Sequence, residues 1–521
     1  MLLRRESKVL GLAGLAVLAT AATLTVLPSL RSDPAAAGPG RAEPTAGRVV
    51  PGPRGTRDAE VGTADRPNVL LITADDVAIS DMTYMPQTRR LISEQGTTFD
   101  DALAPTPICA PSRASLLTGQ YAHNHGVLTV EGDGGGEQAF DERNTLPVWL
   151  QRAGYETLFL GKYLNGYGDD DDPVVEPGWD EWRPTMGLST YDYLNPVLNI
   201  NGRLSPRHQY STDLLADQST MLLDRQAHAG NPWFMWVNYI APHHGEPGDS
   251  DDGDLLAAGI PTPYVAPRYR GAMAGVPLPA SPNLFRGNAH GTHQAGEPLT
   301  AGERAAVRSG FRQRLESLQS VDDAVARTIE TLRRNDQLDE TIVVFTSDNG
   351  FMTGQHNVYG KLLHYDESLR IPVTMRGPGI PVGEVVETAI TNPDLATTIA
   401  AVAGARPGRP QDGIDIRPLL HTGPRLRIVP IEAYPVHGGF RPVYTGIRYG
   451  PYTYVRLLGG AEELFDRDRD PYELTNAATL PENARILATL RAWDRRYRDC
   501  AGATCPRALR EPEGVATPLP G

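Results

Sequence analysis

Continuous apolar runs alternate with segments of helical periodicity along most of the chain, and this alternation sets the expected fold. Four runs predict strands, namely 68–73, 154–160, 232–240 and 341–347. The runs at 68–73 and 341–347 are continuously apolar, as expected of parallel strands buried on both faces. Apolar residues at helical spacing between 311 and 332 predict a long amphipathic helix that covers the sheet and carries no chemistry. The pattern predicts an α/β fold with a large, mostly parallel central sheet flanked by helices.

The alternation weakens after about residue 420. Residues 443–455 and 463–465 predict a small antiparallel sheet, and residues 480–497 predict a closing helix. Residues 244–300 are rich in Gly, Pro, Asp and Ala without periodicity, so we expect an irregular loop that forms part of a substrate pocket wall. The expected units are a catalytic domain over 67–425, a small C-terminal subdomain over 426–500 and a tail over 501–521.

The N-terminus has the pattern of a targeting segment. Arg4, Arg5 and Lys8 precede an apolar stretch over 9–27, and a small-residue cleavage site follows at 35–37. Residues 1–37 are therefore interpreted as a secretory signal peptide, or as an N-terminal anchor that would tether the protein to a membrane if it stays uncleaved. Residues 38–66 are rich in Gly, Pro and Ala and predict a flexible linker. Either interpretation predicts a secreted or otherwise extracytoplasmic protein.

The net charge restricts the kinds of ligand that the protein can bind, and the cysteines bear on the compartment in which it works. The 521 residues carry 49 basic and 63 acidic side chains, a net charge of −14, which argues against nucleic-acid binding. An anionic substrate would need a local basic pocket. Of the three cysteines, Cys500 and Cys505 are close enough in sequence to form a disulfide, in agreement with export. Cys109 is left without a partner.

Two of the predicted strands end in oxygen-bearing side chains. Asp75 and Asp76 follow the first strand, and Asp348 and Asn349 follow the last. Ligands of open α/β sheets gather at the carboxyl ends of the strands, and adjacent carboxylates repel each other unless a cation lies between them. An all-oxygen set suits Ca²⁺ or Mg²⁺, and Ca²⁺ is favoured because it tolerates irregular coordination.

The stretch CAPSRASLLTG at 109–119 contains the remaining cysteine. Pro111 suits the first turn of a helix, so residues 112–118 are predicted to be helical and Gly119 to end the helix. Cys109 then lies just before a helix N-terminus, where the peptide dipoles favour negative charge. Arg113 adds a fixed cation that can hold an oxyanion through two hydrogen bonds.

These motifs resemble those of the type I, formylglycine-dependent sulfatases. The matching strings are NVLLITADD at 68–76, CAPSRASLLTG at 109–119, GKY at 161–163, TSDNG at 346–350, and the segments 464–466 and 470–476 near the C-terminus. Residues 161–165 and the Pro-His pair at 242–243 look most like the N-acetylglucosamine-6-sulfatase branch. The resemblance implies the alkaline-phosphatase-like sulfatase fold and a sulfated small molecule or sugar as substrate.

The resemblance also implies a mechanism. Cys109 would be converted to formylglycine by a formylglycine-generating enzyme and then hydrated to a diol, one hydroxyl of which attacks sulfur while the other later expels the sulfate. The implied metal ligands are Asp75, Asp76, Cys109, Asp348 and Asn349. Arg113 would hold the diol, and the implied sulfate- and substrate-binding residues are Lys162, Asn165, His243 and Lys361.

Two role assignments stay open at this point. Either His243 or Lys361 would protonate the leaving alcohol, with His243 preferred over His244 because it follows Ala-Pro directly. Many sulfatases have a histidine two residues after the lysine that corresponds to Lys162, whereas this chain has Leu164. Either His125 or Asn165 replaces that histidine, or nothing does.

Two other functions compete with a sulfatase. The first is a phosphoesterase or phosphonate hydrolase of the same superfamily, which paired kinetics on sulfate and phosphate esters would distinguish. The second is an inactive, surface-tethered carbohydrate-binding relative, which an unmodified Cys109 in the secreted protein would favour.

Overall fold

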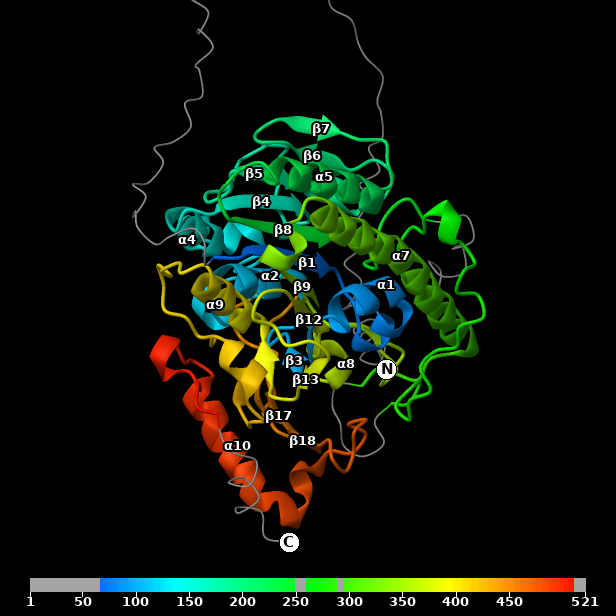
Figure 1. The fold of residues 1–521 in the computed structure, drawn as a ribbon. Coiled ribbons are helices and arrows are strands. Elements are labelled where there is room, and N and C mark those ends of the chain that lie inside the picture. Colours follow the sequence, from blue (N-terminus) through cyan, green and yellow to red (C-terminus); the bar gives the residue numbers. More distant parts are fainter. Residues whose placement is uncertain (1–65, 249–258, 288–294, 510–521) are drawn as a thin grey trace, which may run out of the picture.

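The structure, a computed structural model, describes residues 66–248, 259–287 and 295–509, and its centre is an eight-stranded sheet (Figure 1). The strand order is β13-β2-β12-β9-β1-β8-β4-β5. In chain order the strands are β1 (Asn68–Ala74), β2 (Thr97–Phe99), β4 (Glu156–Gly161), β5 (Glu181–Pro184), β8 (Trp233–Tyr239), β9 (Thr341–Ser347), β12 (Val373–Arg376) and β13 (Glu384–Val386). Strand β12 runs antiparallel to both of its neighbours, and the other pairings in this sheet are parallel. The predicted α/β fold with a mostly parallel sheet is confirmed.

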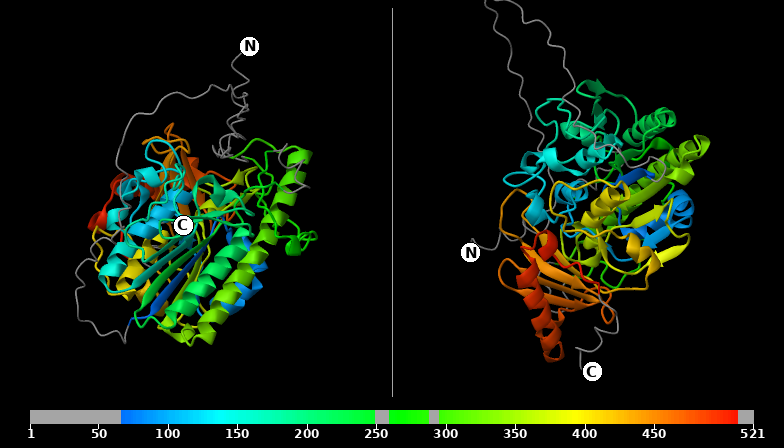
Figure 2. Two further views of the ribbon diagram at one scale, coloured as in Figure 1. Left: turned by 90° about the horizontal axis from the view of Figure 1, so that it is seen from above. Right: turned by 60° about the vertical axis from the view of Figure 1, so that its left-hand side comes forward.

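Helices cover both faces of this sheet (Figure 2). One layer contains α2 (Cys109–Thr118), α4 (Leu146–Arg152) and α9 (Asn392–Val402), and the other contains α5 (Ser211–Gln226) and α7 (Ala301–Arg334). Along β1, Val69 and Leu71 face the first layer, whereas Leu70 and Ile72 face the second. Both faces are therefore buried, which explains why the strands are apolar runs without alternation.

A separate four-stranded antiparallel sheet follows towards the C-terminus, as predicted. It consists of β15 (Ile428–Ala433), β16 (Tyr444–Tyr449), β17 (Tyr452–Leu457) and β18 (Glu462–Asp466). Helix α10 (Ala484–Tyr497) covers one face, and the other face packs on Leu103, Leu369 and Ala389 of the preceding part of the chain. The pattern did not predict β15, which contains Pro430 and lies at the sheet edge, where proline is tolerated.

Some sequence predictions differ from the structure or lie outside it. Helix α2 begins at Cys109, three residues earlier than predicted, because the first turn needs no N–H from Pro111. The proposed leader and almost all of the linker lie outside the described residues, as do 249–258 and 288–294 of the irregular segment and 510–521 of the tail. None of the helices in the described residues combines the length and the hydropathy that a membrane span requires. Cys500 and Cys505 form a disulfide.

One partly buried histidine, His123, links the segment after α2 to the C-terminal sheet and makes the stability of the protein depend on pH. His123, in α3 (Ala122–His125), pairs through Nδ1 with Glu432 Oε1 of β15 at 2.8 Å, and its Nε2 lies 2.8 Å from the Cys500 carbonyl oxygen. Burial opposes the charged ring, but Glu432 outweighs burial and raises the pKa of His123 from 6.5 to about 9. A pKa raised in the folded state means that this stabilisation is complete below pH 6.5 and is lost as pH rises through 9.

We expect the melting temperature of the protein to fall between pH 6.5 and 9 more steeply than that of a His123→Asn variant. The variant should also be the less stable protein at pH 6.5, because Glu432 would remain buried without its cationic partner. Thermal unfolding followed by circular dichroism across this pH range measures both effects. Parallel pH profiles for the two proteins would show that His123 does not carry the dependence.

Candidate active site

The site is assembled from the carboxyl ends of four neighbouring strands of the large sheet. Strands β9, β1, β8 and β4 are consecutive in that sheet and run parallel, so their carboxyl ends meet along one edge. The segments that follow them contribute the side chains of Asp348 and Asn349, Asp75 and Asp76, His243, and Lys162. Gly161 is required here, because a Cβ on it would lie 2.0 Å from the Asn238 carbonyl oxygen of β8.

The oxygen-bearing side chains form one cluster, as expected of a cation site. Carboxylate oxygens of Asp75, Asp76 and Asp348 lie within 4.8 Å of one another, and all three residues are fully buried. Asp348 Oδ1 accepts hydrogen bonds from the backbone N–H of Asp76 at 3.2 Å and of Asn349 at 3.0 Å. The bond from Asp76 holds the ends of β1 and β9 together, and the bond from Asn349 fixes the Asp348 carboxylate locally.

The residues present fit a hard divalent cation. Asn349 Nδ2 donates to Asp76 Oδ1 at 2.6 Å, which leaves Asn349 Oδ1 buried and without a hydrogen-bond partner. A buried orphan acceptor beside three carboxylates is a donor set for Ca²⁺ or Mg²⁺. Burial and the neighbouring charge of Asp75 raise the pKa of Asp348 to about 6. A bound cation would neutralise this repulsion between carboxylates.

Cys109 faces this cluster from the first residue of α2. Its Sγ lies 3.6 Å from Asp75 Oδ1 and accepts a hydrogen bond from Lys361 Nζ at 2.9 Å. Burial, reinforced by the charge of Asp75, raises the pKa of the Cys109 thiol to about 11. The unmodified side chain is therefore a neutral thiol at pH 7.

Arg113, one turn further along α2, fixes the position of the helix relative to the strand ends. Its Nε donates to Asp348 Oδ2 at 2.9 Å, and its Nη1 donates to Asn238 Oδ1 at 3.0 Å and to the Lys162 carbonyl oxygen at 2.8 Å. Nη2 is buried without a hydrogen-bond partner. It lies 3.8 Å from Asp75 Oδ2, beyond hydrogen-bond distance, so its N–H groups can still donate to a bound oxygen atom.

Two lysines and a histidine complete the basic side of the site. Lys162 Nζ pairs with Asp75 Oδ2, and Lys361 Nζ pairs with Asp76 Oδ1. His243 Nε2 lies 4.0 Å from Asp76 Oδ2, and a ring nitrogen of His243 lies within 4.8 Å of Cys109 Sγ. Although burial opposes charge, Asp75 raises the pKa of Lys162 and Asp76 raises the pKa of Lys361, so both lysines are cations.

The structure also places the residues whose roles were open. His125 Nε2 forms a hydrogen bond with Ser115 Oγ of α2 at 3.1 Å, and its Nδ1 accepts one from the Val127 N–H at 3.2 Å. Both ring nitrogens therefore already have partners. Burial lowers the pKa of His125 to about 3. Leu164 is buried in the hydrophobic layer around α2 and α4. Asn165 lies beside the lysine side of the site, donating to the Tyr191 hydroxyl at 3.1 Å.

Sequence reasoning missed three residues that shape this site. Asn238 anchors Arg113, and Tyr191 packs its ring 5.1 Å from Lys162 Nζ. Arg314 lies on α7, which we expected to carry no chemistry, yet its Nη2 donates to the Asp76 carbonyl oxygen at 2.5 Å. The amino-acid composition contains one signal that points to this site. The chain has only three lysines, and two of them, Lys162 and Lys361, are buried here.

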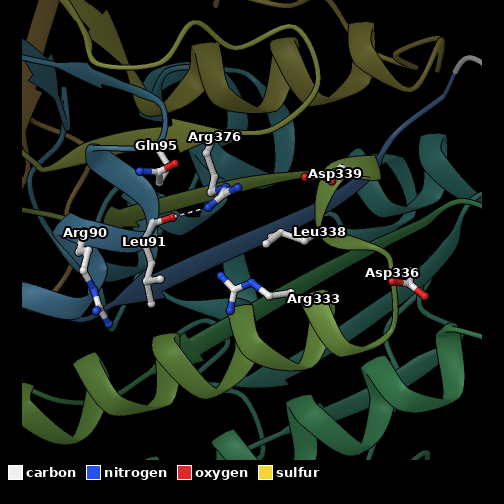
Figure 3. A pocket seen from close by; sticks show the side chains of 8 residues that line it. All are labelled: Arg90, Leu91, Gln95, Arg333, Asp336, Leu338, Asp339 and Arg376. Carbon is white, nitrogen blue, oxygen red and sulfur yellow. Dashed lines mark hydrogen bonds between the residues drawn. The ribbon is translucent and has the colours of Figure 1, made fainter.

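A cavity of about 750 Å³ lies elsewhere in the fold (Figure 3). Arg333, Asp339 and Arg376 are among its lining residues, and Arg376 Nη1 donates to the Leu91 carbonyl oxygen at 2.7 Å. Asp339 precedes β9 and Asp348 follows it, so the length of the strand, roughly 20 Å, separates this cavity from the carboxylate cluster. We assign it no part in the chemistry of the site.

Comparison with known proteins identifies the family and gives the same fold. Residues 67–405 match the family described as Sulfatase, and residues 354–498 match the one described as N-sulphoglucosamine sulphohydrolase, C-terminal. The chain is similar to the N-acetylglucosamine-6-sulfatase of Capra hircus, with 36% identity over 385 residues, 69% of this chain and 65% of the relative. It is also similar to the extracellular sulfatase SULF-1 homolog of Drosophila melanogaster, with 34% identity over 379 residues, 70% of this chain and 32% of the relative.

A solved structure has the same fold. It is described as a complex with its substrate D-glucosamine-2-N,6-O-disulfate and superposes with a TM-score of 0.68 at 22% identity, covering 82% of this chain and 97% of that one. Because the family match covers more than half of the chain, the chain belongs to the sulfatase family. The resemblance inferred from the motifs, including that to the N-acetylglucosamine-6-sulfatase branch, is confirmed. The chain spans about two thirds of the length of the goat relative and one third of the fly relative.

Proposed function

We propose that this chain is a sulfatase that hydrolyses a sulfate ester of a sugar, with Cys109 oxidised to formylglycine and a divalent cation, Ca²⁺ rather than Mg²⁺, at the strand ends. The observation that carries the proposal is the position of Cys109, whose Sγ lies between a carboxylate of the cation site and the ammonium of Lys361. When present, the hydrated formylglycine supplies a hydroxyl nucleophile and the cation supplies Lewis-acid polarisation of a sulfate oxygen. The cation ligands would be Asp75, Asp76, Asp348, Asn349 and the modified residue 109.

The remaining residues bind the sulfate group and move a proton. Lys162 and Lys361 are held as cations by Asp75 and Asp76 and can bind two sulfate oxygens without reorganising when charge develops. Nη2 of Arg113, which has no hydrogen-bond partner, would hold an oxygen atom at residue 109. Either His243 or Lys361 protonates the leaving alcohol. We assign His125 no direct part in the reaction, because its ring is engaged with Ser115 and Val127.

A sulfated amino sugar is the substrate class that we propose. Two observations support it: the similarity to N-acetylglucosamine-6-sulfatase, and the description of the glucosamine-disulfate complex with the same fold. Within this chain, Asn165 Oδ1 is buried without a hydrogen-bond partner on the lysine side of the site. That oxygen can accept a hydrogen bond from a sugar hydroxyl or amide.

The proposed function is tested by paired kinetics on esters of one alcohol. The kcat/KM values for N-acetylglucosamine-6-sulfate and N-acetylglucosamine-6-phosphate would be measured with the same preparation, together with a phosphonate monoester. A sulfatase should prefer the sulfate. Preference for the phosphorus esters would favour the phosphoesterase or phosphonate hydrolase, and binding of the sulfated sugar without turnover would favour the inactive carbohydrate-binding relative.

Removing one of the sulfate-binding groups should slow the reaction strongly. Alanine at Lys162, His243 or Lys361 is expected to lower kcat/KM on an aryl sulfate on the order of 10²–10³-fold each, because each removes a group that stabilises developing charge. Lys361→Arg, which keeps the charge, should retain more activity than Lys361→Ala. The control is Arg485→Ala on the exposed face of α10, and a residue whose alanine variant matches this control does not belong to the site.

Export and maturation follow from the same proposal. We infer that the chain is secreted and is modified at Cys109 by a formylglycine-generating enzyme. The N-terminal pattern, the Cys500–Cys505 disulfide and the extracellular sulfatase among the relatives support this inference. Analysis of the secreted protein's N-terminal residue would distinguish a cleaved leader from a retained anchor.

A further inference from the structure

Arg314 reaches from α7 to three of the segments that form the candidate active site, and its side chain is 2% exposed. Its Nη2 donates to the Asp76 carbonyl oxygen at 2.5 Å, just after β1, and its Nη1 donates to the Pro242 carbonyl oxygen at 3.4 Å, after β8. Its Cζ also lies 3.9 Å from the centroid of the Phe351 ring, which follows β9. One planar group thus contacts the segments that follow β1, β8 and β9.

The backbone of Asp76 has a conformation that residues with a side chain rarely adopt. Its φ is 71°, in the left-handed region. Such a conformation persists where neighbouring contacts enforce it. Here the Asp76 N–H donates to Asp348 Oδ1 at 3.2 Å, and the Asp76 carbonyl oxygen accepts from Arg314. The two polar groups of this peptide turn are therefore held by a residue of the cation site and by Arg314.

The guanidinium of Arg314 is itself held in place. Asp81, in η2 (Ile79–Tyr84), is 1% exposed, and its Oδ2 lies 3.4 Å from Arg314 Nη2. The same oxygen accepts a hydrogen bond from the Ala78 N–H at 3.0 Å. A planar guanidinium that is paired with a carboxylate and stacked on an aromatic ring has little freedom to reorient. The contacts with the strand ends are thus made by a rigid group.

We propose that Arg314 is a positioning residue of the cation site, which fixes the backbone turn in which the Asp76 carboxylate faces the other two carboxylates of the cluster. This rests on the proposed function in one respect, namely that a divalent cation binds these carboxylates. The contact with the Pro242 carbonyl oxygen acts in the same way on the segment that places the adjacent His243. Removing a side chain that orients metal ligands typically costs about 10–100-fold in metal affinity.

Arg314→Lys is expected to bind Ca²⁺ more weakly than the unsubstituted protein. Lysine keeps the positive charge beside Asp81, but its ammonium lacks the planar, fixed set of N–H groups that reaches both carbonyl oxygens while stacked on Phe351. We expect the Kd of metal-free, full-length protein for Ca²⁺ to rise about 10–100-fold in isothermal titration calorimetry. Because the ligands themselves remain, kcat on an aryl sulfate should recover towards the unsubstituted value as Ca²⁺ approaches saturation.

Arg314→Gln is a second variant with the opposite electrostatic effect. It removes a positive charge next to the cation site, which by itself would favour cation binding. A higher Kd in this variant would therefore come from lost positioning. The matched control is Arg427→Lys, which changes another buried arginine that is paired with a buried carboxylate, that of Asp394. Its Kd for Ca²⁺ should equal that of the unsubstituted protein even if its melting temperature falls.

An unchanged Kd in either Arg314 variant, shown to be folded by circular dichroism, would overturn the proposal. So would an equal rise in Arg427→Lys, because the effect would then follow from lost stability. Unsubstituted protein that binds no Ca²⁺ would overturn the cation site and this proposal with it. The titration uses no substrate, so a wrong assignment of the sulfate ester leaves its result unaffected and the two failures are distinguishable.

Discussion

Replacing Cys109 by alanine is expected to abolish turnover while leaving the protein folded. The loss should be on the order of 10⁶ in kcat, the scale seen when a hydrolase loses a covalent nucleophile. Only a buried sulfur atom and its hydrogen bond from Lys361 are removed, so the cost in stability should be roughly 1 kcal/mol. Circular dichroism and kcat on an aryl sulfate measure the two effects in one preparation.

Cys109→Ser is the matched variant for this experiment. Serine keeps the size of the side chain and offers one hydroxyl, which can take the sulfate group but has no second hydroxyl to expel it. We therefore expect little or no turnover and a stable sulfate ester on residue 109, visible as an added mass on the intact protein. Full activity in Cys109→Ala would contradict the proposed chemistry.

Removing the active-site cation should have the second largest effect. Chelation is expected to abolish activity and to lower the melting temperature, because Asp75, Asp76 and Asp348 then face each other without the ion that binds only the folded state. Adding Ca²⁺ should restore both properties. The kcat on an aryl sulfate and the melting temperature would each be measured as a function of the free Ca²⁺ concentration.

Asp348→Asn tests the same site without changing the size of the side chain. The variant should be inactive at any Ca²⁺ concentration, and the chelator should lower its melting temperature less than that of the unsubstituted protein. Asp348 also accepts the hydrogen bond from Arg113 Nε, so some intrinsic destabilisation is expected at all Ca²⁺ concentrations. Chelated protein that is shown to be metal-free and yet retains full activity would exclude the assignment.

The sequence was sufficient to predict which side chains meet at the candidate site wherever their position followed from a regular element. The apolar runs identified the four central strands, and the polar residues after them identified Asp75, Asp76, Lys162 and Asp348, because the ends of parallel strands lie at one edge of a sheet. Cys109 and Arg113 were found through their motif. All of these residues meet in the candidate site.

The residues that were missed act through packing that no local pattern specifies. Arg314 occupies one position of a long amphipathic helix, and only the docking of α7 on the sheet brings its guanidinium to the Asp76 carbonyl oxygen. Asn238 is one polar residue within an apolar strand, and its role depends on the position of Arg113. His125 illustrates the converse case, since its place near the motif in sequence does not bring its ring to the strand ends.

The central claim is tested most directly by the mass of the tryptic peptide 91–113, which contains Cys109. The peptide would be isolated from protein that has been produced with a formylglycine-generating enzyme and shown to hydrolyse a sulfate ester. We expect a fraction of the peptide to carry an aldehyde in place of the CH₂SH group, and that fraction should rise in proportion to the specific activity of the preparation. Fully active protein whose peptide contains only unmodified cysteine would contradict the account.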